Sequence, residues 1–381
     1  MRKGWKYKKL GEVATYINGY AFKPDQWKES GTPIVRIQNL NNENAPYNYY
    51  DGEVPDKVKI QNGDLLISWS ASLGAYIWHG GNAFLNQHIF KVAFDKTDID
   101  KFFLKYAVTS KLAAMAEQVH GATMKHIVKK DFDNTQIPYP PLSTQLAIVS
   151  ELDKINELIR LKKEQLKDFD NLAQSLFYEM FGDPVENEKG WEVKKLNDIC
   201  DVRDGTHDSP KYLQNSEYIL ITSKNIVNGS IDFENVNYIS EEDYIKINKR
   251  SKVDNGDIIM PMIGTIGNPI IAHIDGTHKF CIKNVALIKF LADSTVNNMF
   301  IVNLMRCSSF SSYLLNQNKG GTQKFVALGA IRKLPIPLPP LSLQRLFAQR
   351  IEQIEREKSE VQKSILDLET LLASRMQYWF E

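Results

Sequence analysis

Two copies of one nonapeptide decide the fold: IPYPPLSTQ at residues 137–145 and IPLPPLSLQ at residues 336–344. The prolines in each copy disfavour a helix and remove backbone hydrogen-bond donors, so this part should be extended. The Leu-Ser-x-Gln that follows is a common way to begin a helix. Each copy therefore predicts a hinge at which an extended segment passes into a helix.

The rest of the chain repeats in the same order. Residues 4–39 match 190–225 at a shift of 186, and the Asn-Gly-Asp at 62–64 recurs at a shift of 193. From the Gly-x-Thr-x-Lys segment that begins at residue 121 to the end of the repeat, the shift is 199. Matches that keep their order while the shift grows indicate two homologous units with loop insertions.

Each repeat begins with short strand patterns. The runs TPIVRIQNL at 32–40 and AFLNQHIFKVAF at 83–94 are rich in apolar and β-branched residues, which is typical of strands. A helical run follows at 98–118, with Asp98 as the candidate N-cap. The sequence predicts an α+β protein in which a mixed α/β globule, called a head below, precedes a long helix. We expect the first head at 1–142, the first helix at 143–182, the second head at 183–341 and the second helix at 342–381.

Both long helices carry a heptad seam. Apolar side chains recur at alternating steps of four and three residues, the spacing of a coiled coil. Lys162, Lys358 and Arg375 interrupt the seams; they either fix the register or extend from the edge of the seam into solvent. Two helices related by duplication pair most simply antiparallel, about a pseudo-two-fold axis. The predicted seam residues are Ile148, Leu152, Ile155, Ile159, Leu166, Phe169, Phe347, Ile351, Ile354, Val361, Ile365 and Leu368.

The length of the helices predicts how far apart the two heads can lie. A helix of roughly 39 residues is about 58 Å long at 1.5 Å per residue, which corresponds to about 17 base pairs of duplex DNA. A dumbbell of this size could hold two heads on one duplex at a fixed spacing. The alternative from geometry alone is a scaffold that presents two domains to other proteins.

Composition favours a chain that stays in the cytoplasm. A length of 381 residues suits two or more domains. The charged start MRKGWKYKKL lacks an apolar signal region, and the most apolar tract is broken by proline and glycine, so we expect no membrane segment. The three cysteines are far apart in the sequence, which argues against a disulfide framework. The net charge is +1. The heads are mildly basic and the helices mildly acidic, which permits a phosphate-contacting surface on the heads.

The sequence lacks the motifs of a catalyst. HExxH, CxxC, P-loop and GxGxxG patterns are absent. Glu192-Val193-Lys194 has the ExK form of a nuclease strand, but its counterpart in the first repeat is Lys6-Tyr7-Lys8. We expect no catalytic residue, no metal ligand and no cofactor in this chain.

Several polar turns are suited to nucleic acid. In the Gly-x-Thr-x-Lys segments, glycine allows close approach to a phosphate and lysine supplies a charge. The turns at 17–23, 36–40, 203–208 and 222–226 add side chains that can contact bases or phosphates. The frame residues agree between the repeats while others differ, such as Gln38 and Lys224. The candidate DNA-binding residues are Tyr20, Lys23, Arg36, Gln38, Asn39, Thr123, Lys125, His126, Thr206, His207, Lys224, Asn225, Thr322, Gln323 and Lys324.

Taken in order, these features resemble the specificity subunit of type I restriction–modification enzymes. The resemblance covers nearly the whole chain: the Gly-Trp openings, the Asn-Gly-Asp turns, the Gly-x-Thr-x-Lys segments, the proline nonapeptides and the paired helices all occur twice. It implies two homologous target-recognition domains joined by two spacer helices in an antiparallel coiled coil.

The resemblance also implies function and partners. Such a subunit binds double-stranded DNA at a bipartite, asymmetric site and has no catalytic activity of its own. Two methylation subunits would use S-adenosylmethionine to methylate adenine, and restriction subunits would use ATP and Mg²⁺. Three alternatives stay open: a non-DNA-binding scaffold, a nuclease or methyltransferase in a single chain, and the specificity subunit of a two-component type II enzyme.

Overall fold

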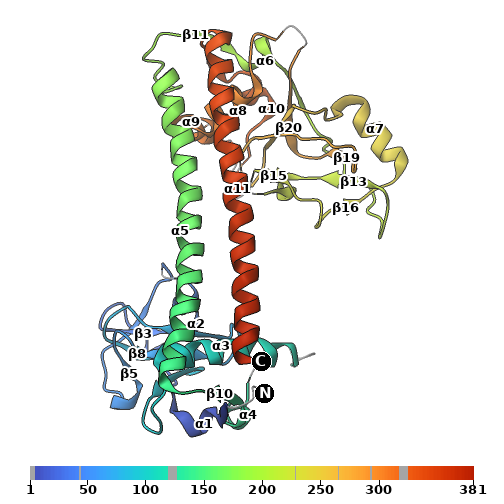
Figure 1. Ribbon diagram of the computed structural model, residues 1–381. Helices are drawn as coiled ribbons and strands as arrows, with labels where there is room; N and C mark the ends of the chain where they lie inside the picture. Colours follow the sequence, from blue (N-terminus) through green and yellow to red (C-terminus); the bar gives the residue numbers. More distant parts are fainter. Residues whose placement is uncertain are drawn as a thin grey trace. The chain divides into compact units, whose positions relative to one another are not determined.

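The chain folds as two compact units. The first unit contains Met1–Lys163 and Lys363–Glu381, and the second contains Glu164–Gln362. Each unit therefore combines one head with about half of each long helix (Figure 1). The computed structural model describes residues 5–42, 44–118, 127–227, 229–264, 266–291, 294–316 and 325–381.

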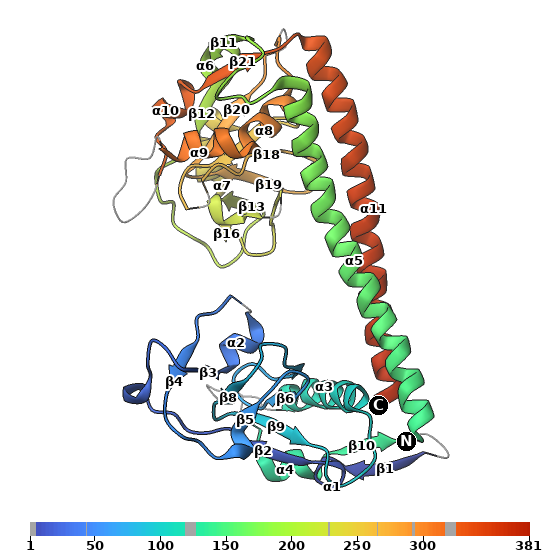
Figure 2. The same cartoon turned by 90° about the vertical axis from the view of Figure 1, so that its left-hand side faces the viewer.

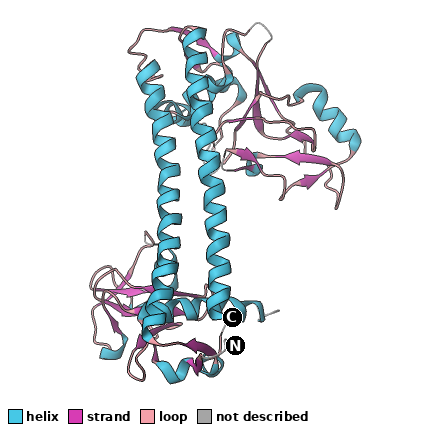
Figure 3. Ribbon diagram, in the orientation of Figure 1, coloured by secondary structure: helices cyan, strands magenta, loops and turns pink. Residues whose placement is uncertain are grey.

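The described residues of the first head form three small sheets (Figure 3). An antiparallel sheet has the order β2-β9-β6-β7, and a second sheet has the order β4-β3-β8-β5, in which β3 and β8 are parallel. The third sheet pairs β1 with β10, the strand that leads into the long helix. The strands are β1 Lys6–Lys9, β2 Thr15–Asn18, β3 Thr32–Val35, β4 Asn48–Tyr50, β5 Lys59–Ile60, β6 Leu65–Ser68, β7 Gly74–Ile77, β8 Ala83–Leu85, β9 Ile89–Ala93 and β10 Gln136–Tyr139. The helices are α1 Leu10–Val13, η1 Pro24–Gln26, α2 Ile37–Asn41, η2 Asp56–Val58, α3 Lys101–Gln118 and α4 Lys129–Asn134.

Within the described residues, the second head repeats most of this topology, with one strand fewer in the sheet that contains a parallel pair and with an additional two-stranded sheet. Its sheets have the orders β12-β20-β17-β18 and β16-β13-β19, with β13 and β19 parallel, and β11 pairs with β21. The strands are β11 Glu192–Lys195, β12 Asp201–Asp204, β13 Tyr218–Ile221, β14 Ile226–Val227, β15 Ser230–Ile231, β16 Asn237–Tyr238, β17 Ile258–Pro261, β18 Ile270–Ile271, β19 Lys279–Ile282, β20 Val285–Lys289 and β21 Pro335–Leu338. The helices are α6 Leu196–Ile199, η3 Ser223–Asn225, α7 Glu241–Ser251, α8 Asn298–Arg306, α9 Ser308–Asn316 and α10 Leu328–Arg332. This shared strand order confirms the predicted duplication and the α+β class.

The repeated Asn-Gly-Asp turns are part of the common frame. Their glycines have positive φ values of 86° and 90°, which glycine adopts readily. Asp64 pairs with Lys91 at 3.0 Å in the first head. Asp257 pairs with Lys289 at the equivalent place in the second head. Each ion pair joins the start of β6 or β17 to the neighbouring central strand.

The proline nonapeptides form the predicted hinges. In the first unit, β10 ends at Tyr139 and α5 (Leu142–Phe181) begins after two prolines. The buried Gln145 side chain donates a hydrogen bond to the carbonyl of Pro140 at 2.9 Å and accepts one from the N–H of Asp100 at 2.8 Å. The glutamine therefore ties the hinge to the start of α3.

The second hinge uses the same contacts. α11 spans Leu341–Phe380, and the buried Gln344 donates to the carbonyl of Pro339 at 2.8 Å. Its side-chain oxygen accepts a hydrogen bond from the N–H of Asn297 at 2.9 Å, just before α8. The nonapeptide is repeated because each head is joined to its long helix in this way.

The predicted N-cap of the helical run was wrong by two residues. Asp100, and not Asp98, accepts a side-chain hydrogen bond from the N–H of Phe103 at 2.8 Å. The carbonyl of Asp98 instead accepts a hydrogen bond from the hydroxyl of Tyr139. Gln145 also binds the N–H of Asp100 and so holds the start of α3 at this residue. The local sequence around residue 98 does not reveal this contact.

In the first unit, α5 and α11 pair antiparallel (Figure 2). Glu151 binds Arg375, and Lys163 binds Glu369 at 2.7 Å. Residue numbers in α11 therefore fall as those in α5 rise. Arg375 also lies over the ring of Trp379, with its guanidinium carbon 5.1 Å from the ring centroid. This basic seam position makes specific contacts between the helices.

The second unit contains the other halves of the same helices. Lys358 binds Asp170 of α5 at 2.7 Å, and the sulfur of Met180 lies 4.0 Å from Arg350, which again gives an antiparallel pair. Lys358 and Arg375 thus form ion pairs across the helices instead of extending freely into solvent. Of the predicted seam side chains, Leu166, Phe169 and Leu368 are half-buried and the other nine are buried.

Aromatic contacts join each head to its helix pair. In the second unit the rings of Phe177 and Phe181 lie 5.7 and 4.9 Å from that of Phe300 in α8. In the first unit Phe103 of α3 contacts Phe380 at a ring distance of 5.4 Å. The long helices therefore belong to the hydrophobic core of each unit, which fixes their orientation on the head.

Candidate nucleic-acid interface

Four segments converge in the second head around the connection between β19 and β20. The N–H of Asn284 donates to the carbonyl of Thr206, in the turn after β12, at 3.3 Å. The hydroxyl of Ser223, in η3 after β13, donates to the carbonyl of Asn284 at 3.2 Å. The fourth segment begins at Phe325, which lines a pocket of about 390 Å³ together with Asn284. The predicted turns at 203–208 and 222–226 are therefore neighbours.

The first head brings the equivalent segments together. The N–H of Gln87, between β8 and β9, donates to the carbonyl of Tyr20 at 2.9 Å. The strand β3, which leads to α2, lies beside β8. The N–H of Ile127 donates to the carbonyl of Trp69 at 3.1 Å, and the N–H of Trp69 donates to His88 at 3.2 Å. One backbone frame thus presents both sets of turns.

Two equivalent asparagines shape these turns. Asn39 and Asn225 are 4% and 3% exposed. The Asn39 side chain accepts from the N–H of Arg36 at 3.0 Å and donates to a loop carbonyl at 3.1 Å. The Asn225 side chain accepts from the N–H of Thr222 at 3.0 Å and donates to a loop carbonyl at 2.9 Å. These two predicted contact residues hold the turns that present their neighbours.

The remaining described candidates of the first head differ in exposure. Tyr20 is half-buried, and its ring packs edge-on against a phenylalanine at 4.9 Å. The guanidinium carbon of Arg36 lies 4.9 Å from the ring centroid of Trp27. Lys23 and Gln38 are exposed. This head therefore offers a stacked cation beside two accessible polar side chains.

The second head presents a different set at the same turns. Lys224 and His207 are exposed, and Thr206 is half-buried. The hydroxyl of Thr206 accepts a hydrogen bond from the N–H of Asp208 at 3.1 Å, which closes the turn after β12. A cation and an imidazole thus stand where the first head has Gln38 and Ala21.

The imidazole of His207 is held from two sides. Its Nε2 lies 2.7 Å from a carboxylate oxygen of Asp204, and its Nδ1 lies 3.0 Å from the amide oxygen of Asn284. Both partners are acceptors, so both nitrogens donate when the ring is protonated. The hydrogen bonds with Asn284 and then with Asp204 raise the pKa of His207 above its ordinary value of 6.5.

The partners of this imidazole were not predicted from the sequence. Asp204 is buried and also binds Arg250 of α7, a helix in the region where the repeat shift changes from 186 to 193. The change from Asn18 to Asp204 within a matched tripeptide was a visible difference between the repeats. The contact with Arg250 had no local signal because 46 residues separate the two in sequence.

The Gly-x-Thr-x-Lys candidates Thr123, Lys125, His126, Thr322, Gln323 and Lys324 lie outside the described residues. Ile127 and Phe325, which follow these segments, both lie at the convergence described above. Within the described ranges, no three His, Cys, Asp or Glu side chains gather as a metal site requires. None of the helices found there is long and apolar enough to cross a membrane.

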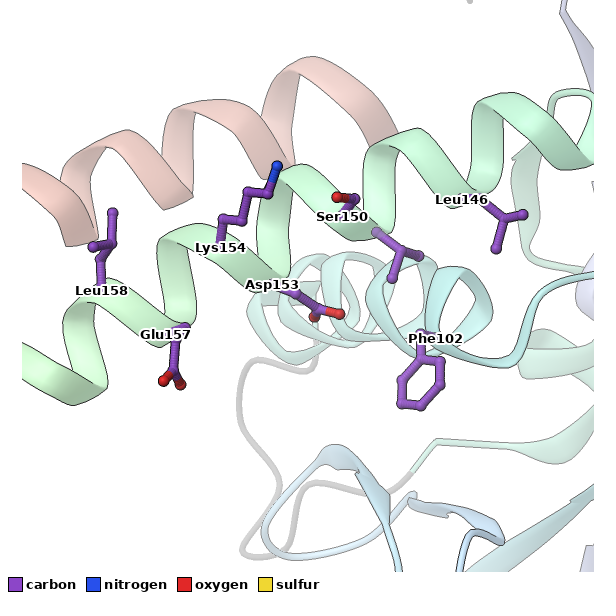
Figure 4. Close-up of a pocket in the computed structure, with 8 residues that line it drawn as sticks. Phe102, Leu146, Ser150, Asp153, Lys154, Glu157 and Leu158 are labelled. Atoms are coloured by element: carbon purple, nitrogen blue, oxygen red, sulfur yellow. The ribbon is translucent and has the colours of Figure 1, made fainter.

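A separate apolar groove lies in the first unit between α3 and α5 (Figure 4). Its volume is about 840 Å³. Phe102, Leu146 and Leu158 line it and are 40%, 50% and 47% exposed. Asp153 at its edge accepts a hydrogen bond from the hydroxyl of Tyr106 at 2.6 Å. Exposed apolar side chains concentrated in a groove are typical of a protein-contact surface.

Curated relatives of the chain are specificity subunits. The Type I restriction enzyme EcoBI specificity subunit of Escherichia coli is 24% identical over 95% of this chain and 81% of its own length. The Type I restriction enzyme MjaVIII specificity subunit of Methanocaldococcus jannaschii is 25% identical over 97% of this chain and 92% of its own length.

Solved structures share the fold. The crystal structure of a type I restriction–modification S subunit from M. genitalium aligns with a TM-score of 0.52 and 13% identity, over 99% of this chain and 96% of that chain. A structure reported for complex assembly and conformational transition of the type I R-M system aligns with a TM-score of 0.62 and 17% identity, over 99% and 97%.

The family model for the type I restriction modification DNA specificity domain matches the chain twice, at residues 2–168 and 188–369. These two matches coincide with the two repeats and account for most of the chain. The chain therefore belongs to the type I restriction–modification DNA specificity family, with one specificity domain in each half.

Proposed function

We propose that this chain is the DNA-recognition subunit of a type I restriction–modification complex, in which each head reads one half of a bipartite, asymmetric site. One observation carries the proposal: a single backbone frame occurs twice and presents different side chains at the same turns. Asn39 and Asn225 make the same frame contacts, while Gln38 and Lys224 differ between the exposed turns. Different contact residues on a common frame suit two different base sequences.

In this proposal the chain performs no chemistry itself. Adenine methylation belongs to two methylation subunits that use S-adenosylmethionine. Cleavage belongs to restriction subunits that use ATP and Mg²⁺. The chain supplies the binding energy and the geometry that bring those subunits to one site.

The helices are the proposed protein-contact surface. They are mildly acidic in sequence and are therefore poor phosphate ligands. The groove of Phe102, Leu146 and Leu158 adds apolar surface beside α5. We propose that a methylation subunit covers this groove, since burial of such side chains stabilises a lasting complex.

The cytoplasm is the proposed location. Cys200, Cys281 and Cys307 are unpaired and buried, and burial raises the pKa of each thiol to about 12. Such thiols are unreactive and are compatible with a reducing compartment.

Two other functions were open from sequence alone. A scaffold without DNA contact is not favoured, because both halves match a DNA specificity domain. The specificity subunit of a two-component type II enzyme would have the same DNA-reading role, so this alternative differs from the proposal in the partner subunits.

Selection from a random duplex pool tests the proposal. The complex of this chain with its methylation subunits should enrich duplexes that share two short conserved blocks separated by a gap of fixed length and free sequence. Methylation subunits alone are the control and should enrich no such motif. An assembled complex that enriches no motif would overturn the DNA-recognition role.

A further inference from the structure

We propose that Asp204, Arg250 and Asn284 are positioning residues that hold the protonated imidazole of His207 as a fixed cation against a DNA phosphate. DNA binding by the second head would then be coupled to the uptake of a proton. This inference rests on the proposed function, and it adds a phosphate contact and its dependence on pH at the same site.

The geometry restricts what the imidazole can do. Asp204 uses one carboxylate oxygen for His207 and the other for Arg250. Asn284 occupies the second ring nitrogen at 3.0 Å. With both nitrogens engaged, the ring has no hydrogen bond left for a base edge. Its side chain is nevertheless 63% exposed, so it can act on a ligand through its charge.

The charges around the ring do not neutralise the positive charge of protonated His207. Asp204 on β12 and Arg250 on α7 form one pair. Asp208 in the same turn and Lys246 on α7 form a loose pair at 3.8 Å. Lys283, before β20, donates to the hydroxyl of Ser209 at 2.6 Å. Asp243 of α7 lines the same pocket as Asp208 and accepts a hydrogen bond from the hydroxyl of Ser240 at 2.9 Å. Protonation of His207 therefore adds a positive charge beside Asp204, whose other carboxylate oxygen already binds Arg250.

Phosphate is the ligand chemistry that fits this surface. A fixed, exposed cation without a free donor can compensate the charge of a phosphate without selecting a base, because this charge term does not depend on DNA sequence. The neighbouring turn carries the exposed Lys224, and Ser223 connects that turn to Asn284 at 3.2 Å. The side chains of His207 and Lys224 therefore both belong to turns that contact the connection between β19 and β20.

The first head is built differently at these positions. Asn18 stands at the place of Asp204, and its side chain accepts a hydrogen bond from the indole of Trp69 at 3.3 Å. Ala21 stands at the place of His207. A half-buried histidine, His88, lies in the connection and packs against Trp69 at a ring distance of 5.0 Å. The Asp–Arg–His arrangement belongs to the second head.

The sign of the effect follows from the raised pKa of His207, whose ordinary value is 6.5. Below its raised pKa the ring is charged and attracts phosphate; as the pH rises through that value the charge is lost. DNA affinity should therefore fall as the pH rises through that raised pKa, which lies above 6.5. The charged form should release about one more counterion, which steepens the salt dependence by about 0.9.

The first test measures DNA affinity of the full complex on its selected duplex, at pH 6.0 and 8.5 and at several salt concentrations. We expect about two- to fivefold weaker binding at the higher pH, the range of one exposed ion pair. His207→Gln should remove the difference in affinity between the two pH values. It should also remove the part of the salt dependence that comes from the charge of His207. His79→Gln, at an exposed histidine of the first head, is the matched control and should retain both.

The second test measures the pKa of His207 directly. Histidine ring carbons of the full chain are labelled, and the NMR signal that His207→Gln deletes is titrated with and without the duplex. We expect a pKa above 6.5 that rises further when DNA is bound. Asp204→Asn keeps the side-chain shape and should lower that pKa.

The outcomes separate the two proposals. Failure of the complex to bind any selected duplex contradicts the DNA-recognition role itself. Specific binding with the same pH and salt dependence in wild type and His207→Gln leaves that role intact and overturns the inference. A His207 signal whose pKa does not respond to the duplex also overturns it.

Discussion

Single buried side chains connect the repeated motifs to the fold. Gln145 and Gln344 are each 1% exposed and each bridge a proline carbonyl and the N–H that starts a helix. Their removal would leave two buried backbone groups without a partner, which costs far more than the loss of an exposed contact. The nonapeptide is thus a structural signal and not a binding motif.

Replacement of these glutamines should destabilise one unit at a time. We expect Gln145→Ala or Gln344→Ala to lower the free energy of unfolding by about 1–3 kcal/mol, the cost of unsatisfied buried polar groups. Thermal unfolding and urea denaturation measure the change. Gln362→Ala, at an exposed position of α11, is the control and should change stability by less than about 0.5 kcal/mol. Equal small effects at all three sites would contradict the bridging role.

The lysines of the Gly-x-Thr-x-Lys segments give a prediction about DNA. Lys125→Ala and Lys324→Ala should each weaken DNA binding and reduce the salt slope by about one unit, because each removes one phosphate charge. Binding isotherms of the complex at several salt concentrations provide the measurement. Unchanged affinity and slope in both variants would remove these segments from the interface.

At the scale of elements, the two long helices combine two roles. Their buried seams belong to the cores of the units, and their ion pairs fix the antiparallel register through Glu151–Arg375 and Asp170–Lys358. In our proposal their exposed faces contact the methylation subunits. The two faces are not equivalent, since Leu146 of the first repeat corresponds to Arg345 of the second.

Substitution in the groove tests the proposed partner surface. Leu146→Arg with Leu158→Glu places the residues of the second repeat into the first, and both sites are about half exposed. Stability should change little. Affinity for the methylation subunit should fall tenfold or more, since apolar anchors supply much of interface energy. Sedimentation of mixtures at several concentrations gives the affinity.

The control for the groove is Leu291→Glu, at a site 56% exposed and outside both helices. It should leave assembly unchanged. If the groove variant assembles as tightly as this control, the methylation subunit does not use the groove.

The helices should also set the distance between the half-sites. Insertion of one heptad after Lys163 in α5 and after Gln362 in α11 keeps the seam pattern and adds about 10 Å of helix. The unread gap of the recognised motif should grow by about three base pairs. Selection of bound duplexes measures the gap, and an insertion in α5 alone is the control for misfolding. A gap of unchanged length would show that the helices do not determine the spacing.

Much of the molecule could be predicted where the signal was local or repeated. The proline hinges, the heptads and the ordered shifts between repeats indicated duplicated α+β heads and paired helices, all now seen in the structure. The parallel pairing of β3 with β8 could not be predicted, since periodicity does not reveal strand order. The division of α3 into α8 and α9 in the second head also had no clear signal.

The candidate site was predictable only in outline. The turns were found because they differ between repeats while Asn39 and Asn225 agree, but the two asparagines are held inside the turns by hydrogen bonds to the backbone. The partners of His207 were missed because Arg250 comes from α7, which is much longer than η2 at the equivalent place in the first head. Contacts made by an insertion depend on tertiary structure that no local pattern encodes.

The whole molecule is a duplicated DNA specificity domain. We propose that each half reads its own DNA sequence. The most direct test is long-read mapping of methylated adenines in cells that express this chain with its methylation subunit, compared with cells that lack this chain. We predict a split motif that requires this chain, and a second-head variant such as Lys224→Gln should alter recognition in one half of that motif. An assembled complex that adds no methylated motif, or a variant that alters both halves together, would contradict the account.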